Sequence, residues 1–522
     1  MKKGFTLIEL LAVIVILAII ALIATPIVLD IIEDSKNSSI KRSAELYLDA
    51  VEQAIATSAM NGGLEDGTYI IDSKGNLKYK DKTIKVDVKN YNFESGTVII
   101  EQGQIKDIKL SNNEKVTTGK ELTKIDKWDG KTVTEVTADS NGIYHITKAS
   151  ELAWVAQKVN SGETFAGKTI SLDASLDLGG RYDKDGNKLG TEWIPIGTKK
   201  SDDELFPFKG TFEGNNNVIS GIYINKPQED LAENQYLGLF GYSDAAIIRS
   251  LVMKDSYIKG YSNIGVVCGR VFNGGNINNI VVDNIYVDSI RISGVVVGAT
   301  HTNISLSNLY SYNSEIKGGD IYIGGVVGAA QINCSLDNIY GNSTVSNTNE
   351  ARLTATGGII GGMIKESRAN NLVSEATVSG YSGVGGITGQ IQQNSIITNS
   401  VSYATVSGMN IIGGIIGMNA SNSGGVTLEN IKSYASIIAK GEYIGGVIGQ
   451  ITKGENSYDN IYSKAKVKGK DKVGGIIGGF SVDEDSTLNY KNIVSEATVE
   501  GETNKGELWG YVDAKTVLNS LD

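Results

Sequence analysis

Side chains able to carry out acid–base or metal chemistry are sparse in this 522-residue chain. It holds two histidines, His145 and His301, and two cysteines, Cys268 and Cys334. Structural zinc sites take four protein ligands and catalytic ones three, so neither residue type can build such a centre alone. Neither histidine has a serine or cysteine partner pattern that would indicate a catalytic triad. We therefore predict a protein that is not an enzyme and uses no cofactor.

One segment spaces its oxygen atoms as calcium loops do. Asp183, Asp185 and Asn187 occupy alternate positions along the chain. A complete loop of this kind places a bidentate glutamate at its twelfth position, which here is Ile194. We therefore favour a solvated turn, with calcium binding as the alternative.

Another carboxylate, Glu9, is the only charge between Phe5 and Leu29. As a helix this segment spans about 37 Å, which is enough to cross a bilayer. Lys2 and Lys3 precede it, so the positive-inside rule keeps the N-terminus cytoplasmic. A secretory signal peptide would have a shorter apolar segment, and a plain anchor gains nothing from a carboxylate. A buried carboxylate in such a helix indicates a functional site.

At these residues the chain resembles the type IV pilin family. The resemblance rests on a short basic leader ending at Gly4, then Phe5, then Thr-Leu-Ile-Glu up to Glu9. It implies that a prepilin peptidase cuts between Gly4 and Phe5 on the cytoplasmic side and that Phe5 is then N-methylated. The new amine can neutralise Glu9 of a neighbouring subunit in a filament, since a buried charge without a partner is strongly destabilising.

The pilin-like part is expected to contain a leader (1–4), a stem helix (5–62, with 5–29 in the membrane or filament core) and a small antiparallel sheet (63–110). Pro26 lacks an amide donor and should kink the helix. Residues 111–126 are polar and without periodicity, which predicts a linker.

Glycine divides the chain into two regions, because residues 1–125 hold only eight of its 63 glycines. From residue 236 a motif of an apolar residue, one or two glycines, apolar residues and a closing glycine recurs every 28 to 33 residues. A fixed period near 30 with many β-branched residues predicts a β-solenoid. We assign 127–235 to a cap and the first coils, 236–512 to the repeats and 513–522 to a tail.

An asparagine recurs once per coil and is expected to form a side-chain amide ladder. We expect the glycines to permit tight corners at positive φ. The two cysteines fall about two coils apart, roughly 10 Å, so both are predicted to be buried thiols rather than a disulfide. The ladder residues are Asn279, Asn308, Asn338, Asn371, Asn399, Asn430, Asn460 and Asn492.

The repeats, with the segments Trp193–Gly197 and Phe208–Asn225, resemble the GLUG-motif family of bacterial surface proteins. The resemblance covers roughly residues 127–512 and implies a right-handed parallel β-helix like those of adhesin regions. Tyrosines recur two or four residues after the ladder position, and exposed aromatics of this kind bind sugars or proteins. We favour cross-strand packing of these rings, with a ligand surface as the alternative. These tyrosines are Tyr310, Tyr312, Tyr340, Tyr403, Tyr434 and Tyr462.

Together these features predict a minor or tip-located type IV pilin-like subunit that displays an adhesive β-helix on the cell surface. The alternatives are a pseudopilin of a secretion or DNA-uptake system and a surface-anchored glycan-processing enzyme. The expected partners are other pilin subunits, the prepilin peptidase and methyltransferase, the inner membrane before assembly, and a host or surface glycan or protein. The formal charge of −11 argues against nucleic acid. No anchor is expected after Val512, so anchoring rests on the N-terminal helix.

Overall fold

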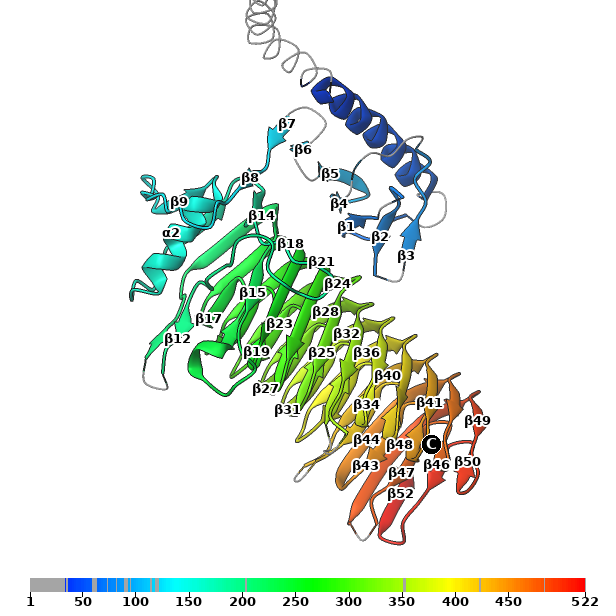
Figure 1. Cartoon of the computed structure of the whole chain (residues 1–522). Coiled ribbons are helices and arrows are strands. Elements are labelled where there is room, and N and C mark those ends of the chain that lie inside the picture. Colours follow the sequence, from blue (N-terminus) through cyan, green and yellow to red (C-terminus); the bar gives the residue numbers. More distant parts are fainter. Residues whose placement is uncertain are drawn as a thin grey trace, which may run out of the picture. The chain divides into compact units, whose positions relative to one another are not determined.

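The computed structural model describes residues 33, 36–58, 63–72, 74–80, 82–88, 93, 95–112, 115–117, 122–201, 204–350, 354–421, 424–482 and 484–521. The chain divides into two compact units, Met1–Ile125 and Asp126–Asp522. Figure 1 shows the helices and strands of both units.

The first unit combines a helix with an antiparallel sheet. The helix is described over residues 36–58, and Ala44, Tyr47 and Val51 on one of its faces are fully buried. The Tyr47 hydroxyl donates to the carbonyl of Gly75 at 2.8 Å, so the helix is fixed to a turn of the sheet. The strand order is β3-β2-β1-β4-β5-β6-β7. The strands are β1 (Gly67–Ile71), β2 (Leu77–Tyr79), β3 (Lys82–Ile84), β4 (Ser95–Glu101), β5 (Gln104–Ser111), β6 (Lys115–Thr117) and β7 (Leu122–Lys124).

The sheet is larger than the sequence predicts. Residues 111–126 were expected to form a linker, but β6 and β7 lie within them and extend the sheet by antiparallel pairing. Lys115 and Thr117 are buried polar residues, so this segment lacks the apolar alternation that reveals a strand. Among the described residues, no helix is both long and apolar enough to span a membrane. The predicted membrane segment 5–29 lies outside the described residues.

The second unit is a β-solenoid of about 12 turns. One complete coil consists of β32 (Arg368–Ser374), β33 (Thr377–Ser379), β34 (Ser382–Gly385) and β35 (Thr388–Ile391). Each strand pairs in parallel with its equivalent one coil later. This pairing builds four stacks, which we number first to fourth after β32, β33, β34 and β35 (Figure 1). The interior is filled by one or two apolar side chains from each strand, here Leu372, Val378, Val384 and Ile391, all fully buried.

The stacks begin and end at different strands. The third runs from β16 (Gln235–Leu237) to β50 (Lys505–Gly506), and the fourth from β17 (Phe240–Asp244) to β51 (Trp509–Tyr511). Residues 513–522 were expected to be a tail, but β52 (Thr516–Ser520) pairs in parallel with β48 (Ser486–Ser495) and continues the first stack.

A small α/β segment precedes the repeats. Helix α2 (Ala149–Val159) follows β9 (Ile143–Ile146), which pairs in parallel with β10 (Thr169–Leu172). Leu152, Val155 and Val159 are almost completely buried and belong to the same hydrophobic core as the coils. Helix α2 therefore covers the apolar interior at the first coils, as terminal caps of repeat proteins do.

The ladder asparagines occupy bends inside the strands of the first stack. All eight have φ between 50° and 56°, and Ser250 has 56° at the same position one coil earlier. This left-handed conformation is unfavourable for most L-residues, but asparagine tolerates it well. Asparagine thus turns the chain at this corner while its amide remains available for hydrogen bonds.

The amides form a ladder with two interruptions. Asn399 donates to Asn370 instead of Asn371, and Asn492 donates to Asp459. The regular steps, each an Nδ2 donating to the Oδ1 one coil earlier, are Asn308 to Asn279 (2.8 Å), Asn338 to Asn308 (2.5 Å), Asn371 to Asn338 (3.1 Å), Asn430 to Asn399 (2.9 Å) and Asn460 to Asn430 (2.7 Å).

The repeat glycines have a different role from the one expected. None of the glycines of the repeat motif has positive φ in the described coils. They are instead required by the close stacking of backbones. A Cβ on Gly385 would lie 2.0 Å from the carbonyl oxygen of Thr388, and one on Gly389 would lie 2.1 Å from the backbone nitrogen of Thr356. Asparagine makes the corners, and glycine allows the coils to approach.

We predict that Asn430→Ala is more destabilising than Asn430→Gly. Both changes remove the amide bonds to Asn399 and Asn460, but only alanine is strained at a φ of 56°. The difference should be about 1 kcal/mol, measured by urea unfolding of the full-length chain in detergent. Equal losses would show that the corner does not constrain the residue type.

Candidate functional site

The predicted processing and assembly residues lie outside the described part of the chain. This applies to Gly4, Phe5, Glu9 and Pro26. The surface and cavities of the second unit therefore provide the geometric evidence for a binding site.

Three of the six predicted surface tyrosines are buried. Tyr310, Tyr312 and Tyr340 are 3%, 1% and 3% exposed, so they do not present an open aromatic surface. The ring of Tyr340 packs 5.1 Å from that of Tyr312, and its hydroxyl donates to Glu375 at 2.7 Å. The hydroxyl of Tyr310 accepts a hydrogen bond from Asn338 at 2.8 Å. For these three the alternative of a ligand surface is wrong, because their rings are buried between the coils.

The other three tyrosines form a stack that reaches the surface. Tyr403 and Tyr434 are 44% and 37% exposed, with ring centroids 5.2 Å apart and planes at 9°. Tyr462 follows at 5.8 Å, and its hydroxyl donates to Glu496 at 2.8 Å. Since the rings cover one another's faces, they offer mainly edges and hydroxyls, which suits hydrogen bonding better than stacking on a sugar ring.

The candidate calcium loop is an internally bonded turn. The Oδ1 of Asp183 accepts from the backbone N–H groups of Asp185 and Asn187, both at 2.9 Å, and its Oδ2 accepts from the Asn187 side chain. The carboxylate of Asp183 is therefore committed to its own turn, and these bonds lower its pKa. Among the described residues, no group of three histidine, cysteine or acidic side chains gathers as metal ligands would.

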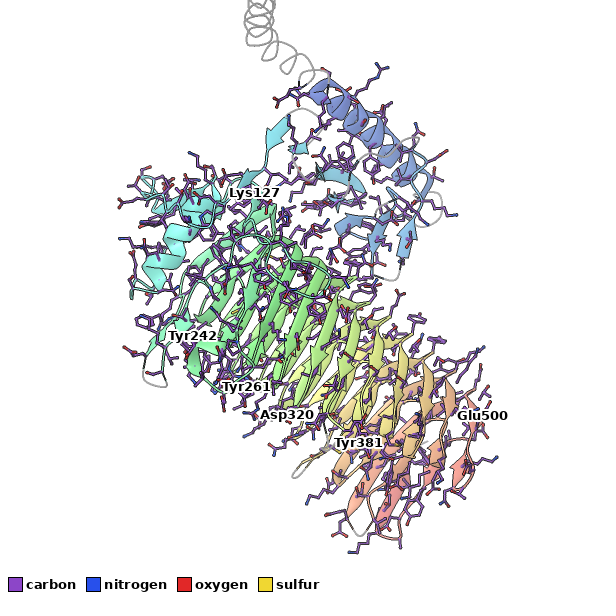
Figure 2. The ribbon with its side chains drawn as sticks, in the orientation of Figure 1. Lys127, Tyr242, Tyr261, Asp320, Tyr381 and Glu500 are labelled. Carbon is purple, nitrogen blue, oxygen red and sulfur yellow. The ribbon has the colours of Figure 1, made fainter. Side chains whose placement is uncertain are left out.

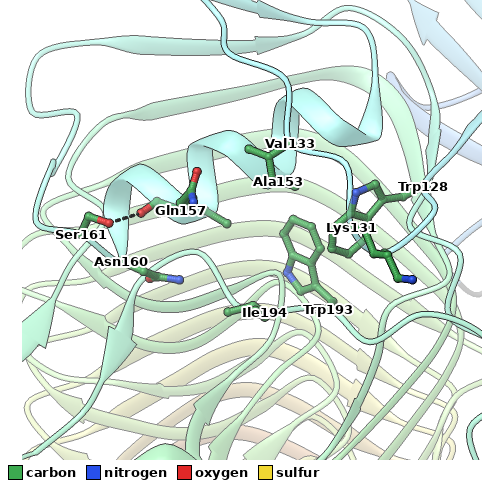
Figure 3. A pocket seen from close by; sticks show the side chains of 11 residues that line it. Trp128, Lys131, Val133, Ala153, Gln157, Asn160, Ser161, Trp193 and Ile194 are labelled. Carbon is green, nitrogen blue, oxygen red and sulfur yellow. Dashed lines mark hydrogen bonds between the residues drawn. The ribbon is translucent and has the colours of Figure 1, made fainter.

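A cavity of about 350 Å³ opens beside helix α2 (Figure 3). Trp128 and Trp193 lie against it with their rings edge to face at 5.6 Å. Ile194 and Val133 also line it and are 62% and 43% exposed, which is high for large apolar side chains. Lys131, Gln157, Asn160 and Ser161 supply its polar side chains.

Most polar groups of this cavity are already engaged. The indole N–H of Trp193 donates to the carbonyl of Leu239, and Asn160 bonds both the carbonyl of Pro195 and the amide of Gly197. These bonds hold the segment of Pro195 against α2 and keep the cavity open. The cavity suits an apolar group of modest size, with Gln157 and Lys131 able to orient a polar substituent.

Sequence reasoning missed this cavity because its walls come from segments about 60 residues apart. Trp128 and Trp193 are two of only four tryptophans in the chain, and this rarity was the only signal available. The two cysteines are free and buried, as predicted. Burial raises the pKa of the Cys268 thiol to about 12, so this thiol is unreactive at neutral pH.

The pKa values of the two histidines are shifted in opposite directions from the ordinary value. Hydrogen bonds to Asp173 (2.6 Å) and then Asp139 (3.4 Å) raise the pKa of His145 above 6.5. Burial and then the positive charge of Arg270 lower the pKa of His301 below 6.5. The contribution of His145 to stability is therefore complete below about pH 6.5 and is lost as pH rises through its folded pKa, whereas that of His301 is lost as pH falls. NMR titration of the two imidazoles measures both values, and coincident titrations near 6.5 would contradict these environments.

Three comparisons relate the chain to known proteins. Residues 1–25 match the family model described as the prokaryotic N-terminal methylation motif. Comparison with curated proteins gives no match. A solved structure described as "a putative immunoglobulin A1 protease from Bacteroides ovatus" is similar, with 21% identity and a TM-score of 0.39, over 59% of this chain and 80% of that one.

Proposed function

We propose that the chain is a pilin-like subunit that is cleaved after Gly4, inserted through its N-terminal helix and displayed outside the cell with its solenoid as a binding module. The observation that carries this proposal is a single chain that joins an N-terminal methylation motif to a β-solenoid. The motif implies processing by a prepilin peptidase, membrane insertion and assembly with other pilins.

The size of the second unit favours a minor or tip-located subunit. About 400 residues follow the first unit, and such a module would crowd a shaft built from small heads. The second unit supports a binding role, since the Tyr403 stack in the repeats and the cavity beside α2 both offer groups that a ligand can contact. The likeness of the repeats to GLUG-motif surface proteins agrees with this interpretation.

The mature N-terminus tests the proposal. Mass spectrometry of the chain isolated from its native cells should show that residues 1–4 are absent and that Phe5 carries one additional methyl group. A Gly4→Leu variant should retain its leader and remain in the membrane fraction, whereas the matched Lys3→Arg variant should be processed normally. An intact Met1 on the extracellular protein would refute the proposal.

A further inference from the structure

Arg270 is an almost fully buried cation on the outer side of the fourth stack. It lies in β20 (Cys268–Phe272), between Tyr242 and Ala299 in the parallel register, and is 9% exposed. Ala329 follows Ala299 one coil later. Because Ala299 and Ala329 have small side chains, the side chain of Arg270 extends across two coils and reaches Gln331. Tyr242, at the start of this row, lies along the same side of the solenoid as Asp320 and Tyr381 (Figure 2).

The partners of this guanidinium are all neutral. Nη1 donates to Oδ1 of Asn263 at 3.0 Å and Nη2 donates to Oε1 of Gln331 at 2.9 Å. Nε is buried and has no hydrogen-bond partner among the described residues. In contrast, Arg181 and Arg249 each pair with a carboxylate, at 2.7 and 2.5 Å. A buried charge without a counter-charge is costly, which makes this arrangement unusual for a purely structural arginine.

Aromatic groups surround the cation. The guanidinium lies 5.1 Å from the centroid of the Phe272 ring, and the imidazole of His301 stacks on the same ring, with centroids 4.6 Å apart and planes at 13°. Tyr236 and Tyr242 stack at 5.7 Å nearby. Burial lowers the pKa of the Arg270 guanidinium below its usual range, as expected for a cation that no carboxylate of the described residues neutralises.

We propose that Arg270 forms an oxyanion-binding site that takes a carboxylate or sulfate group. A guanidinium has five N–H donors in a rigid fork that matches such groups, and only two are used by the neighbouring amides. A bound anion would supply the missing counter-charge, and bonds between charged groups are the stronger class of hydrogen bond. This site does not depend on the N-terminal motif, so it stands or falls separately from the proposed display.

The two histidines allow a direct test by NMR of the full-length chain in detergent micelles. Sodium sulfate and sodium glucuronate are added at constant ionic strength, with sodium chloride as the reference. Saturable movement of the His301 signal and an increase in its pKa are expected, because the anion offsets the charge of Arg270. His145, held by Asp139 and Asp173, should not respond and serves as the internal reference.

Two arginine variants make the test specific. Arg270→Lys keeps the charge but loses the fork, so sulfate affinity should fall about tenfold or more. Arg249→Gln, a paired surface arginine, should bind as the wild type does. The proposal is overturned if chloride moves both histidine signals as sulfate does, or if the wild-type titration does not saturate. It is also overturned if Arg270→Lys binds sulfate with unchanged affinity. The wild-type titration decides even if Arg270→Lys folds poorly.

An oligosaccharide of glucuronate distinguishes the source of the anionic group. Tighter binding of the oligomer than of the monomer would identify a polymer-borne carboxylate and would indicate contacts along the stack beyond Arg270. Equal affinity would identify a small free anion. Both results support an oxyanion site, whereas binding of neither compound, together with no response to sulfate, rejects it.

Discussion

Replacing Gly386 with alanine is expected to destabilise the solenoid by about 3 kcal/mol or more. An added Cβ would lie 2.1 Å from the carbonyl oxygen of Gly414 in the next coil and 2.4 Å from the Oγ of Ser402. The nearest obstacle is backbone that is held by the stack, so it cannot move aside without separating the coils. The measurement is urea unfolding of the full-length chain, followed by circular dichroism.

Gly319 provides the matched control for this variant. It also lies in the solenoid, but the nearest atom to an added Cβ is the carbonyl oxygen of Ile290 at 3.5 Å, an ordinary contact. Gly319→Ala should therefore unfold close to the wild-type urea concentration. If Gly386→Ala and Gly319→Ala behave alike, close stacking does not explain the repeat glycines.

Replacing Glu9 with alanine is expected to leave cleavage and membrane insertion intact and to prevent incorporation into filaments. The carboxylate is proposed to pair with the amine of Phe5 on a neighbouring subunit inside an apolar core. Removing one partner of a buried pair costs about 3–5 kcal/mol, which corresponds to a decrease of about 100-fold or more in incorporation. The amount of subunit in sheared filaments, relative to the membrane fraction, measures the effect.

Glu52→Ala is the control for the assembly variant. Glu52 is an exposed carboxylate in the helix over 36–58, so its removal changes the charge equally without touching an apolar core. Normal incorporation of both variants would refute the pairing role of Glu9. Loss of both would point to a general effect of net charge.

The repeat could be predicted from the sequence because each coil is an independent copy of the same pattern. The spacing of Gly389, Gly417 and Gly449 already places equivalent residues one above another, and parallel pairing in the structure agrees with this register. The corner positions of the ladder asparagines follow from the same alignment. The hand of the coil stays a prediction.

The features that the sequence did not reveal depend on three-dimensional contacts. Tyr312 and Tyr403 both stand four residues after a ladder asparagine, yet Tyr312 is 1% exposed and Tyr403 is 44% exposed, so exposure depends on the neighbouring coils. A second corner, where Asn333 donates to Asn303 at 2.7 Å and both have positive φ, has the same period as the first and was overlooked beside it. The charge of Arg270 is visible in the sequence, but its isolation from carboxylates is not.

The most direct test of the account is immunogold labelling of intact cells with an antibody against residues 127–522. The proposed function predicts label outside the cell, on filaments or at their ends, and loss of that label in the Gly4→Leu strain. Label on short structures close to the envelope would favour a pseudopilin. Label confined to the membrane, with none outside the cell, would contradict the display of the solenoid.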